Sequence, residues 1–88
     1  MSAASDVLVP AVRPMNHEDL EAVARIEQQS YDYPWSTGIF RDCLLAGYLC
    51  LVIEQAGELR GYGILSVAAG EAHVLNVCVA PAFRRRGS

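Results

Sequence analysis

Apolar residues that alternate or cluster along the chain predict four β-strands. The first is expected over residues 7–13, which are rich in valine and leucine, and Pro10 and Pro14 confine it to a sheet edge or end it. Three further segments of this kind are separated by glycine-containing turns: residues 48–55, 59–69 and 71–79. Because short turns join these three strands, they are expected to form an antiparallel meander. Gly61 and Gly63 indicate a bulge or a close backbone approach in its middle strand.

Two helices are predicted between the first strand and the meander. In the first helix, apolar residues recur at three- and four-residue spacing: Leu20, Val23, Ala24 and Ile26. Asn16 is its candidate N-cap, with Asp19 placed to complete a capping box, and the helix is expected to end near Ser30. Ser36 is the candidate cap of a second helix over residues 37–46. The order β-α-α-β-β-β predicts an α+β domain with helices on an antiparallel sheet.

The composition is that of a single domain. The chain has 88 residues, 52% of them hydrophobic, which excludes a wholly disordered segment. We expect residues 1–6 to be disordered and residues 7–88 to form one partial domain. The longest uninterrupted apolar run, residues 49–53, is far shorter than the ~20 residues that span a bilayer, and no signal peptide is visible. We therefore expect no membrane association.

The cysteines and histidines indicate no metal site. Cys43, Cys50 and Cys78 are an odd number at wide spacing, and His17 and His73 complete no ligand pattern with them. Free cysteine behaves as a small apolar residue, so we expect three reduced and mostly buried thiols in a cytoplasmic protein.

The net charge of −3 is unevenly distributed. All seven basic residues are arginines, and three of them lie together near the C-terminus: Arg84, Arg85 and Arg86. The remainder carries four arginines against ten acidic residues, which argues against direct nucleic-acid binding. A cationic spot beside Gly87 suits a compact phosphate-bearing ligand, although an exposed charged end without a role fits the charge equally well.

The last predicted strand and the turn after it form the main candidate binding site. Alternation assigns two sets of residues to opposite faces: Glu71, His73, Leu75, Val77 and Val79 on one, and Ala72, Val74, Asn76, Cys78 and Ala80 on the other. Both faces are apolar after residue 74, so we expect the end of this strand to be buried centrally. Pro81 ends the pairing, which leaves backbone groups near residues 77–79 for a ligand. The amides of an Arg/Gly turn commonly bind phosphate.

Residues 76–87, which read Asn-Val-Cys-Val-Ala-Pro-Ala-Phe-Arg-Arg-Arg-Gly, resemble the acetyl-CoA-binding motif of the GNAT superfamily of N-acetyltransferases, whose turn reads Q/R-x-x-G-x-G/A. Arg84 and Gly87 match its first and fourth positions and Ser88 its fifth, and the closing Gly or Ala is absent. Three further segments narrow the resemblance to the RimI-type ribosomal-protein alanine N-acetyltransferases: Glu27-Gln28, Tyr33-Pro34-Trp35-Ser36 and Glu71-Ala72. The resemblance runs from about Val12 to the end and implies the N-terminal half of the acetyltransferase fold.

The resemblance implies acetyl-CoA as co-substrate and no metal. The backbone of Val77, Cys78 and Val79 would pair with the pantetheine arm, and the Val79 amide would polarise the thioester carbonyl. The pyrophosphate and outer phosphates would be held by the turn: Arg84, Arg85, Arg86, Gly87 and Ser88.

The resemblance also implies an acceptor site. The loop of Tyr33, Pro34, Trp35 and Ser36 would border the groove for the N-terminal peptide of a protein, a ribosomal one in the family's manner. Trp35 is equally suited to anchor the core beneath the two helices, and the two roles can coexist.

The implied reaction is direct attack of a neutral amine on the thioester, with a base for the ammonium proton and an acid for the departing thiolate. RimI-type enzymes assign these roles to a Glu and a Tyr in the second half of the fold, which no position here matches. Glu71 and His73 are the candidate proton relays, with simple solvation as the alternative for Glu71.

Cys78 lies close to the expected thioester, which raises the alternative of a covalent acetyl-cysteine intermediate. Direct transfer needs no such nucleophile, so packing is the expected role of Cys78.

Two functional hypotheses follow. The first is an acetyl-CoA-dependent N-acetyltransferase for a protein N-terminal amine, with the alanine of a ribosomal protein as acceptor, present as an incomplete form that catalyses poorly by itself. The second is a non-catalytic, truncated acetyltransferase-like module that self-associates or binds a partner through an exposed strand edge. A small nucleic-acid binder is disfavoured by the acidic body and the lack of an aromatic–basic face.

Overall fold

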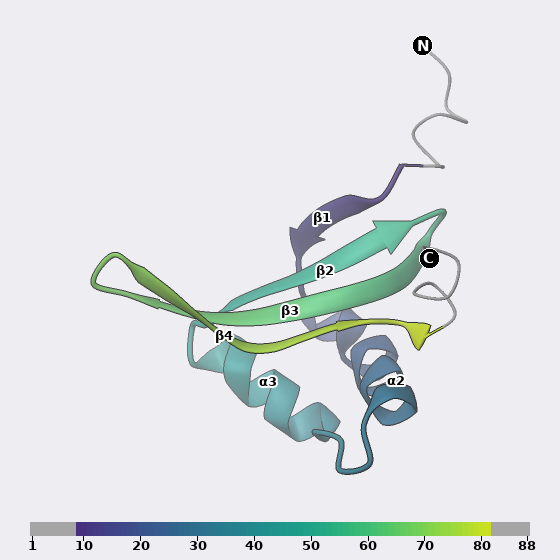
Figure 1. Cartoon of the computed structure of the whole chain (residues 1–88), viewed down its shortest axis with the longest axis horizontal. Helices are drawn as coiled ribbons and strands as arrows, with labels where there is room; N and C mark the ends of the chain where they lie inside the picture. The colour runs from purple at the N-terminus through teal and green to yellow at the C-terminus, as the bar shows by residue number, and fades with distance from the viewer. Residues whose placement is uncertain (1–8, 82–88) are drawn as a thin grey trace.

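The computed structural model describes residues 9–81 and arranges them as a four-stranded antiparallel sheet with two α-helices on one face (Figure 1). The elements, in chain order, are β1 (Ala11–Pro14), a 3₁₀ turn η1 (His17–Asp19), α2 (Leu20–Ser30), α3 (Thr37–Leu45), β2 (Leu49–Gln55), β3 (Glu58–Ala68) and β4 (Glu71–Val79). The strands lie in the order β1-β2-β3-β4, each antiparallel to its neighbour. This confirms the predicted α+β class and the β-α-α-β-β-β order.

Both helical segments begin at the predicted caps. Asn16 caps η1, which continues directly into α2: its side chain accepts a hydrogen bond from the Glu18 amide, and the Asp19 carboxylate accepts one from the Asn16 amide. Ser36 caps α3, since its hydroxyl accepts a hydrogen bond from the Ile39 amide. These side chains satisfy amides that the first turn of a helix leaves without partners, so the helix starts are fixed locally.

The first strand is shorter than predicted. Its pairing with β2 covers Ala11 to Pro14, whereas the sequence predicted a strand over residues 7–13. Val9 and Pro10 are exposed and lie outside the strand, and residues 7 and 8 are not among the described residues. Proline has no amide to donate, which accounts for a strand that begins after Pro10.

The core lies between the helices and one face of the sheet. Its most deeply buried side chains come from both helices and from β2 and β3: Val23, Phe40, Val52, Tyr62 and Ile64. The rings of Phe40 and Tyr62 meet edge to face, with centroids 5.4 Å apart. Helix α2 contacts both β3 and β4, so the segment that connects α2 to α3 begins next to these two strands.

Strand β4 departs from the predicted alternation because it contains a bulge. Ile64 pairs with Asn76 and Leu65 pairs with Val74, so Leu75 has no partner and is the extra residue. An extra residue reverses the alternation beyond it. The two faces of β4 are therefore Glu71, His73, Asn76 and Cys78 on the helix side of the sheet, and Ala72, Val74, Val77 and Val79 on the other side. The prediction that Glu71 and His73 share a face with Val77 and Val79 is wrong.

The end of β4 is not buried centrally, which corrects a second expectation. Within the described residues β4 is an edge strand, and Val77 is 53% exposed. Cys78 is the one fully buried residue of β4, and its side chain points toward the helices. The predicted close approach at Gly61 is confirmed, since a Cβ there would lie 2.7 Å from the Cys78 carbonyl oxygen. The adjacent Arg60 is the extra residue of a bulge in β3.

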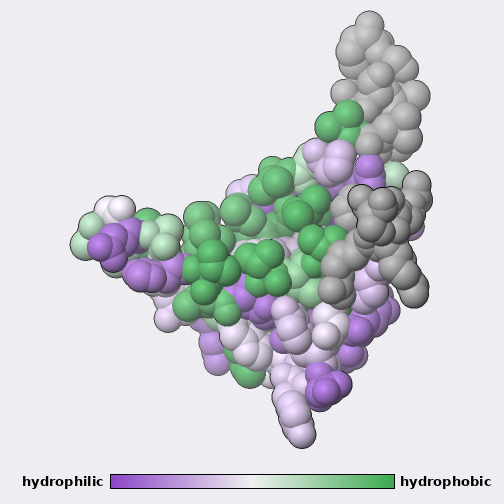
Figure 2. Space-filling view, viewed as in Figure 1, coloured by the Kyte–Doolittle hydropathy of each residue, from purple (hydrophilic) through white to green (hydrophobic). Residues whose placement is uncertain are grey.

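The sheet face that the helices leave uncovered is aliphatic. We call it the aliphatic face, and the pairing places these larger side chains on it: Val12, Leu49, Leu51, Ile53, Leu65, Val67, Val74, Val77 and Val79. Figure 2 shows hydrophobic side chains gathered over the strands. An antiparallel sheet with one solvated face normally alternates apolar and polar residues, which these strands do not.

Candidate functional site

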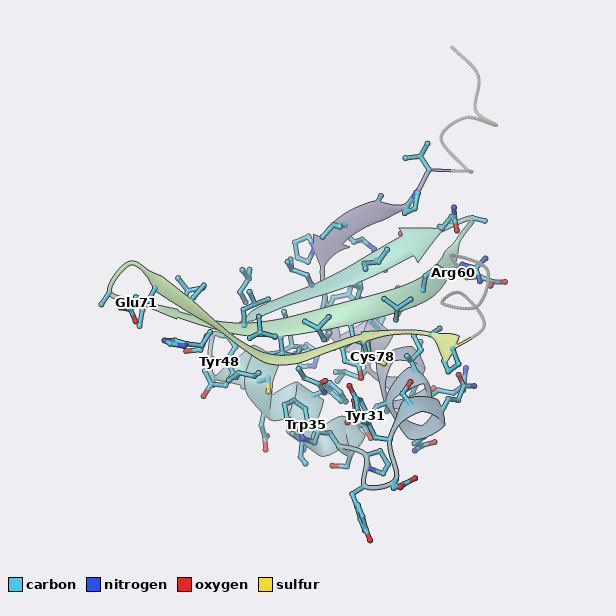
Figure 3. The ribbon with its side chains drawn as sticks, viewed as in Figure 1. Tyr31, Trp35, Tyr48, Arg60, Glu71 and Cys78 are labelled. Carbon is cyan, nitrogen blue, oxygen red and sulfur yellow. The ribbon has the colours of Figure 1, made fainter. Side chains whose placement is uncertain are left out.

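A pocket opens between the connection of the two helices and strand β4. Its volume is about 440 Å³, and it is lined by Glu27, Tyr31, Asp32, Tyr33, Trp35, Leu75 and Asn76. We call residues 31–36 the pocket loop. Tyr31 and Trp35 lie close to β4 (Figure 3). The bulge residue Leu75 lines the pocket, so the irregularity of β4 helps to shape it.

Glu27 of α2 forms the floor of this pocket. It is only 2% exposed, and its carboxylate accepts hydrogen bonds from three other elements. The Trp35 amide donates to Oε2 at 3.0 Å, the Asn76 side-chain amide donates to Oε1 at 2.9 Å, and the Tyr62 hydroxyl also donates to Oε1. Burial, together with the hydrogen bond to Glu27, raises the pKa of Tyr62, so its hydroxyl remains a neutral donor.

The lining gives the pocket an acidic and aromatic character. Among residues 9–81 Glu27 forms no ion pair, and Asp32 adds a second carboxylate at the rim. Tyr31, Tyr33 and Trp35 supply aromatic surface. Carboxylates and ring faces both attract cationic groups and hydrogen-bond donors, so the pocket suits an amine rather than an anion.

The predicted acceptor residues take different places in the pocket loop. Tyr33 and Pro34 are exposed, Tyr33 at 94%. Trp35 lines the pocket and also packs on Phe40, with ring centroids 5.3 Å apart, so it combines a pocket wall with a core anchor. Ser36 uses its hydroxyl as the cap of α3. The structure thus brings Tyr33 and Trp35 to the pocket.

The backbone of β4 presents alternate groups to its open edge. The Ala80 amide donates to the Arg60 carbonyl of β3 at 2.7 Å. Hydrogen-bonded pairs alternate with non-bonded pairs in an antiparallel ladder, so Cys78 also directs its backbone groups at β3. It follows that Val77 and Val79 direct theirs away from β3.

The pocket loop contacts this same edge. The Tyr31 hydroxyl donates to the Val77 carbonyl at 3.4 Å, as expected for a carbonyl that faces away from β3. The acidic pocket and the outward backbone groups of β4 are therefore neighbours, and one ligand is able to contact both.

Cys78 differs from its two neighbours in β4. Its side chain is buried, and its thiol donates to the Ser30 hydroxyl of α2 at 3.1 Å. The thiol therefore lies on the helix side of the sheet, in agreement with the packing role expected for it.

Glu71 and His73 lie at the far end of β4. The Glu71 Oε1 and His73 Nε2 atoms are 3.4 Å apart, and both side chains are largely exposed on the β3–β4 hairpin. Figure 3 shows Glu71 at the tip of this hairpin, away from Tyr31, Trp35 and Cys78. A strand rises by about 3.3 Å per residue and Leu75 is an extra bulge residue, so Glu71 lies roughly 23 Å along β4 from Val79. Their proposed proton relay stays a prediction, as does phosphate binding by residues 84–88, which lie outside the described residues.

The sequence patterns had assigned no role to Glu27, Tyr31, Asn76 or Tyr62. One signal was available: Glu27 lies three residues after Ala24 and seven after Leu20, on the apolar stripe of the helix. A carboxylate on such a stripe is buried and needs donors. The donors themselves come from strands that only the fold brings next to α2.

Neither a metal-binding cluster nor a membrane-spanning helix is found in the described part of the chain. Within residues 9–81 no group of three or more His, Cys, Asp and Glu side chains is arranged to hold a metal ion. None of the helices in that part of the chain has the length and apolar character needed to cross a bilayer.

Comparison with known proteins relates the chain to acetyltransferases. Residues 20–88 match the model of the acetyltransferase (GNAT) family. A putative ribosomal protein bS18-alanine N-acetyltransferase of Bacillus subtilis is 36% identical over an alignment of 76 residues, and the alignment covers 84% of this chain and 50% of that protein. The chain spans about half the length of the curated relatives it matches.

Solved structures give a similar result. The crystal structure of the ribosomal-protein-S18-alanine N-acetyltransferase from Escherichia coli matches with a TM-score of 0.80 and 29% identity, over 90% of this chain and 51% of that chain. The PaiA N-acetyltransferase of Thermoplasma acidophilum, solved in complex with coenzyme A, shares the fold with a TM-score of 0.74 and 17% identity, over 86% of this chain and 62% of that chain.

Proposed function

The chain belongs to the acetyltransferase (GNAT) family, and from this premise we propose that it serves acetyl transfer from acetyl-CoA to a protein N-terminal amine. The alanine of a ribosomal protein is the proposed acceptor, by similarity to relatives named for that reaction. The cytoplasm is the proposed location, which fits three cysteines that are all free.

The observation that carries this proposal is the position of the acidic pocket beside the open edge of β4. Val77 and Val79 direct backbone donors and acceptors away from β3, which is what an amide-containing arm such as pantetheine requires. The pocket suits an amine and opens beside this edge of β4, next to the Val77 carbonyl. A thioester bound along β4 would therefore lie within reach of an amine in the pocket.

The proposed reaction is direct transfer. The neutral amine nitrogen attacks the thioester carbonyl carbon, a C–N bond forms, the C–S bond breaks, and the thiolate leaves with the sulfur electron pair. The nitrogen gives up one proton to water as the amide forms, and the thiolate takes up one proton from water, so the products are the N-acetylated amine and the free thiol. The Val79 amide would donate a hydrogen bond to the developing oxyanion. Cys78 needs no covalent role, and its thiol faces α2.

The test is calorimetry of acetyl-CoA with this chain and with its Val79→Pro variant. Proline removes the outward amide of Val79 but no hydrogen bond to β3, because an edge strand tolerates proline where the amide faces outward. We expect wild type to bind and Val79→Pro to bind about tenfold more weakly, the equivalent of one hydrogen bond. Val12→Pro, on the other edge strand, is the matched control and should bind normally.

Two results would count against the proposal. If the wild-type chain gives no binding heat, acetyl-CoA is not its ligand. If wild type and Val79→Pro bind acetyl-CoA with equal affinity, the pantetheine arm does not bind at the β4 edge.

A second candidate function is supported by a separate observation. Val74, Leu75 and Val77 are exposed on β4, which is an edge strand of the described sheet. Apolar side chains beside backbone groups that face away from the sheet favour pairing with another chain. A non-catalytic module that self-associates or binds a partner through this edge is therefore the alternative.

A further inference from the structure

We propose that Glu27 is a positioning residue that holds the pocket loop against β4 and thereby sets where the acceptor amine meets the bound thioester. The effect of Glu27 on the acceptor amine rests on the proposed function, whereas its role in holding the pocket loop rests on its hydrogen bonds alone. The experiment measures these two roles separately.

The contacts of Glu27 join four parts of the fold. Its own helix is α2, and its three donors belong to the pocket loop, to β3 and to β4: Trp35, Tyr62 and Asn76. From the pocket loop it is the backbone amide of Trp35 that donates to this carboxylate. One buried side chain thus ties the loop to both strands.

Only a carboxylate can satisfy all three donors. An ionised carboxylate is purely an acceptor, with two lone pairs on each oxygen, and here Oε1 accepts two hydrogen bonds and Oε2 accepts one. A carboxamide of the same shape has one accepting oxygen and one donating NH₂ group. Whichever way the carboxamide of a Glu27→Gln variant is turned, one of the three donors would face the NH₂ group or lose its acceptor.

In Glu27→Gln, the hydrogen bond that is lost is expected to be the one whose loss costs the least free energy. Tyr62 is 1% exposed, so its hydroxyl would remain without water if it lost Glu27. The Trp35 amide lies in a loop at the surface and is able to exchange the carboxylate for water. Leaving a buried donor unsatisfied costs more than releasing one to solvent, so Glu27→Gln is expected to release the loop at Trp35.

The chain contains its own reporter of this release. Trp35 is the single tryptophan, so tryptophan fluorescence, excited selectively over that of the four tyrosines, reports on the pocket loop. In wild type the ring packs on Phe40. We expect Glu27→Gln to shift the emission to longer wavelength and to increase quenching by acrylamide at least twofold, with the far-ultraviolet circular dichroism unchanged.

A second variant distinguishes positioning from general damage. In Glu27→Gln/Tyr62→Phe the buried hydroxyl is gone, so the glutamine oxygen is free to accept the Trp35 amide while its NH₂ group donates to the turned amide of Asn76. We expect this double variant to restore the wild-type emission and quenching. Glu21→Gln makes the same charge change on the exposed side of α2 and should leave Trp35 unaffected.

The outcome is decided without acetyl-CoA. Wild-type emission and quenching in Glu27→Gln would overturn the proposal. If Glu27→Gln does not fold, the double variant carries the test, and a double variant that is unfolded or has a released Trp35 would overturn it as well.

The link to the acceptor is measured separately. In calorimetry with an alanine-initiated peptide, Glu27→Gln should weaken peptide binding about tenfold while acetyl-CoA binding is retained. Equal loss of both ligands would contradict a role confined to the acceptor side. If wild type fails to bind acetyl-CoA, the proposed function falls and the Trp35 result still stands.

Discussion

Among single residues, Asp19 is a carboxylate whose hydrogen bonds shift its pKa. Its two carboxylate oxygens each accept a hydrogen bond from the Arg13 guanidinium at 2.9 Å, and the Asn16 amide adds a third at 2.9 Å. The Arg13 hydrogen bonds hold the pKa of Asp19 below its usual range, although burial acts in the opposite direction. The residue thus joins β1 to the start of α2 through its ionised form.

This pKa shift predicts how stability depends on pH. A carboxylate whose pKa is lowered on folding stabilises the native state above its unfolded pKa of about 3.9, and that contribution is lost as pH falls through the folded pKa. Asp19→Asn should therefore reduce the free energy of unfolding by about 2 kcal/mol at pH 7. The difference from wild type should shrink in urea titrations below pH 4. Glu18→Gln, at an exposed neighbour, is the control, and a difference that stays constant with pH would contradict the assignment.

At the scale of elements, helix starts were predictable and the faces of β4 were not. Asn16 and Ser36 act through their own neighbours, so the sequence alone located them. The bulge at Leu75 depends on how β4 pairs with β3, and pairing is a non-local property. The same holds for Glu27, whose burial was readable from its helix but whose donors were not.

The junction of β3 and β4 allows a matched pair of glycine variants. A Cβ at Gly61 would lie 2.7 Å from the Cys78 carbonyl oxygen, whereas a Cβ at Gly63 would lie 3.6 Å from its nearest neighbour, a methyl group of Val77. We expect Gly61→Ala to displace the end of β4 and to cost about 1–3 kcal/mol of stability. Gly63→Ala should be neutral or slightly stabilising, because it makes only ordinary contacts. Thermal unfolding of the two variants tests this, and equal melting temperatures would show that β4 adapts without cost.

At the scale of the whole molecule, the sheet is apolar on both faces and the helices cover only one. Residues 49–53 read Leu-Cys-Leu-Val-Ile, an uninterrupted apolar run that is typical of a strand buried on both sides. Cys50 and Val52 are buried under the helices, and the other three residues belong to the aliphatic face. This run therefore favours a second covering layer over the aliphatic face, a conclusion that needs the strand pairing as well as the sequence.

The aliphatic face and the adjacent β4 edge predict concentration-dependent association of this chain. Exposed apolar surface of this extent is unfavourable in water, and two copies are able to bury it against each other. Sedimentation velocity should show a mass that rises with concentration for wild type and a monomer for the double variant Val74→Lys/Val77→Lys. Leu45→Lys, at an apolar residue of α3 that is 70% exposed, is the matched control and should associate like wild type. Wild-type chain that stays monomeric at millimolar concentration would contradict association and with it the second candidate function. If Leu45→Lys also abolishes association, the contact lies on the helices rather than on the sheet.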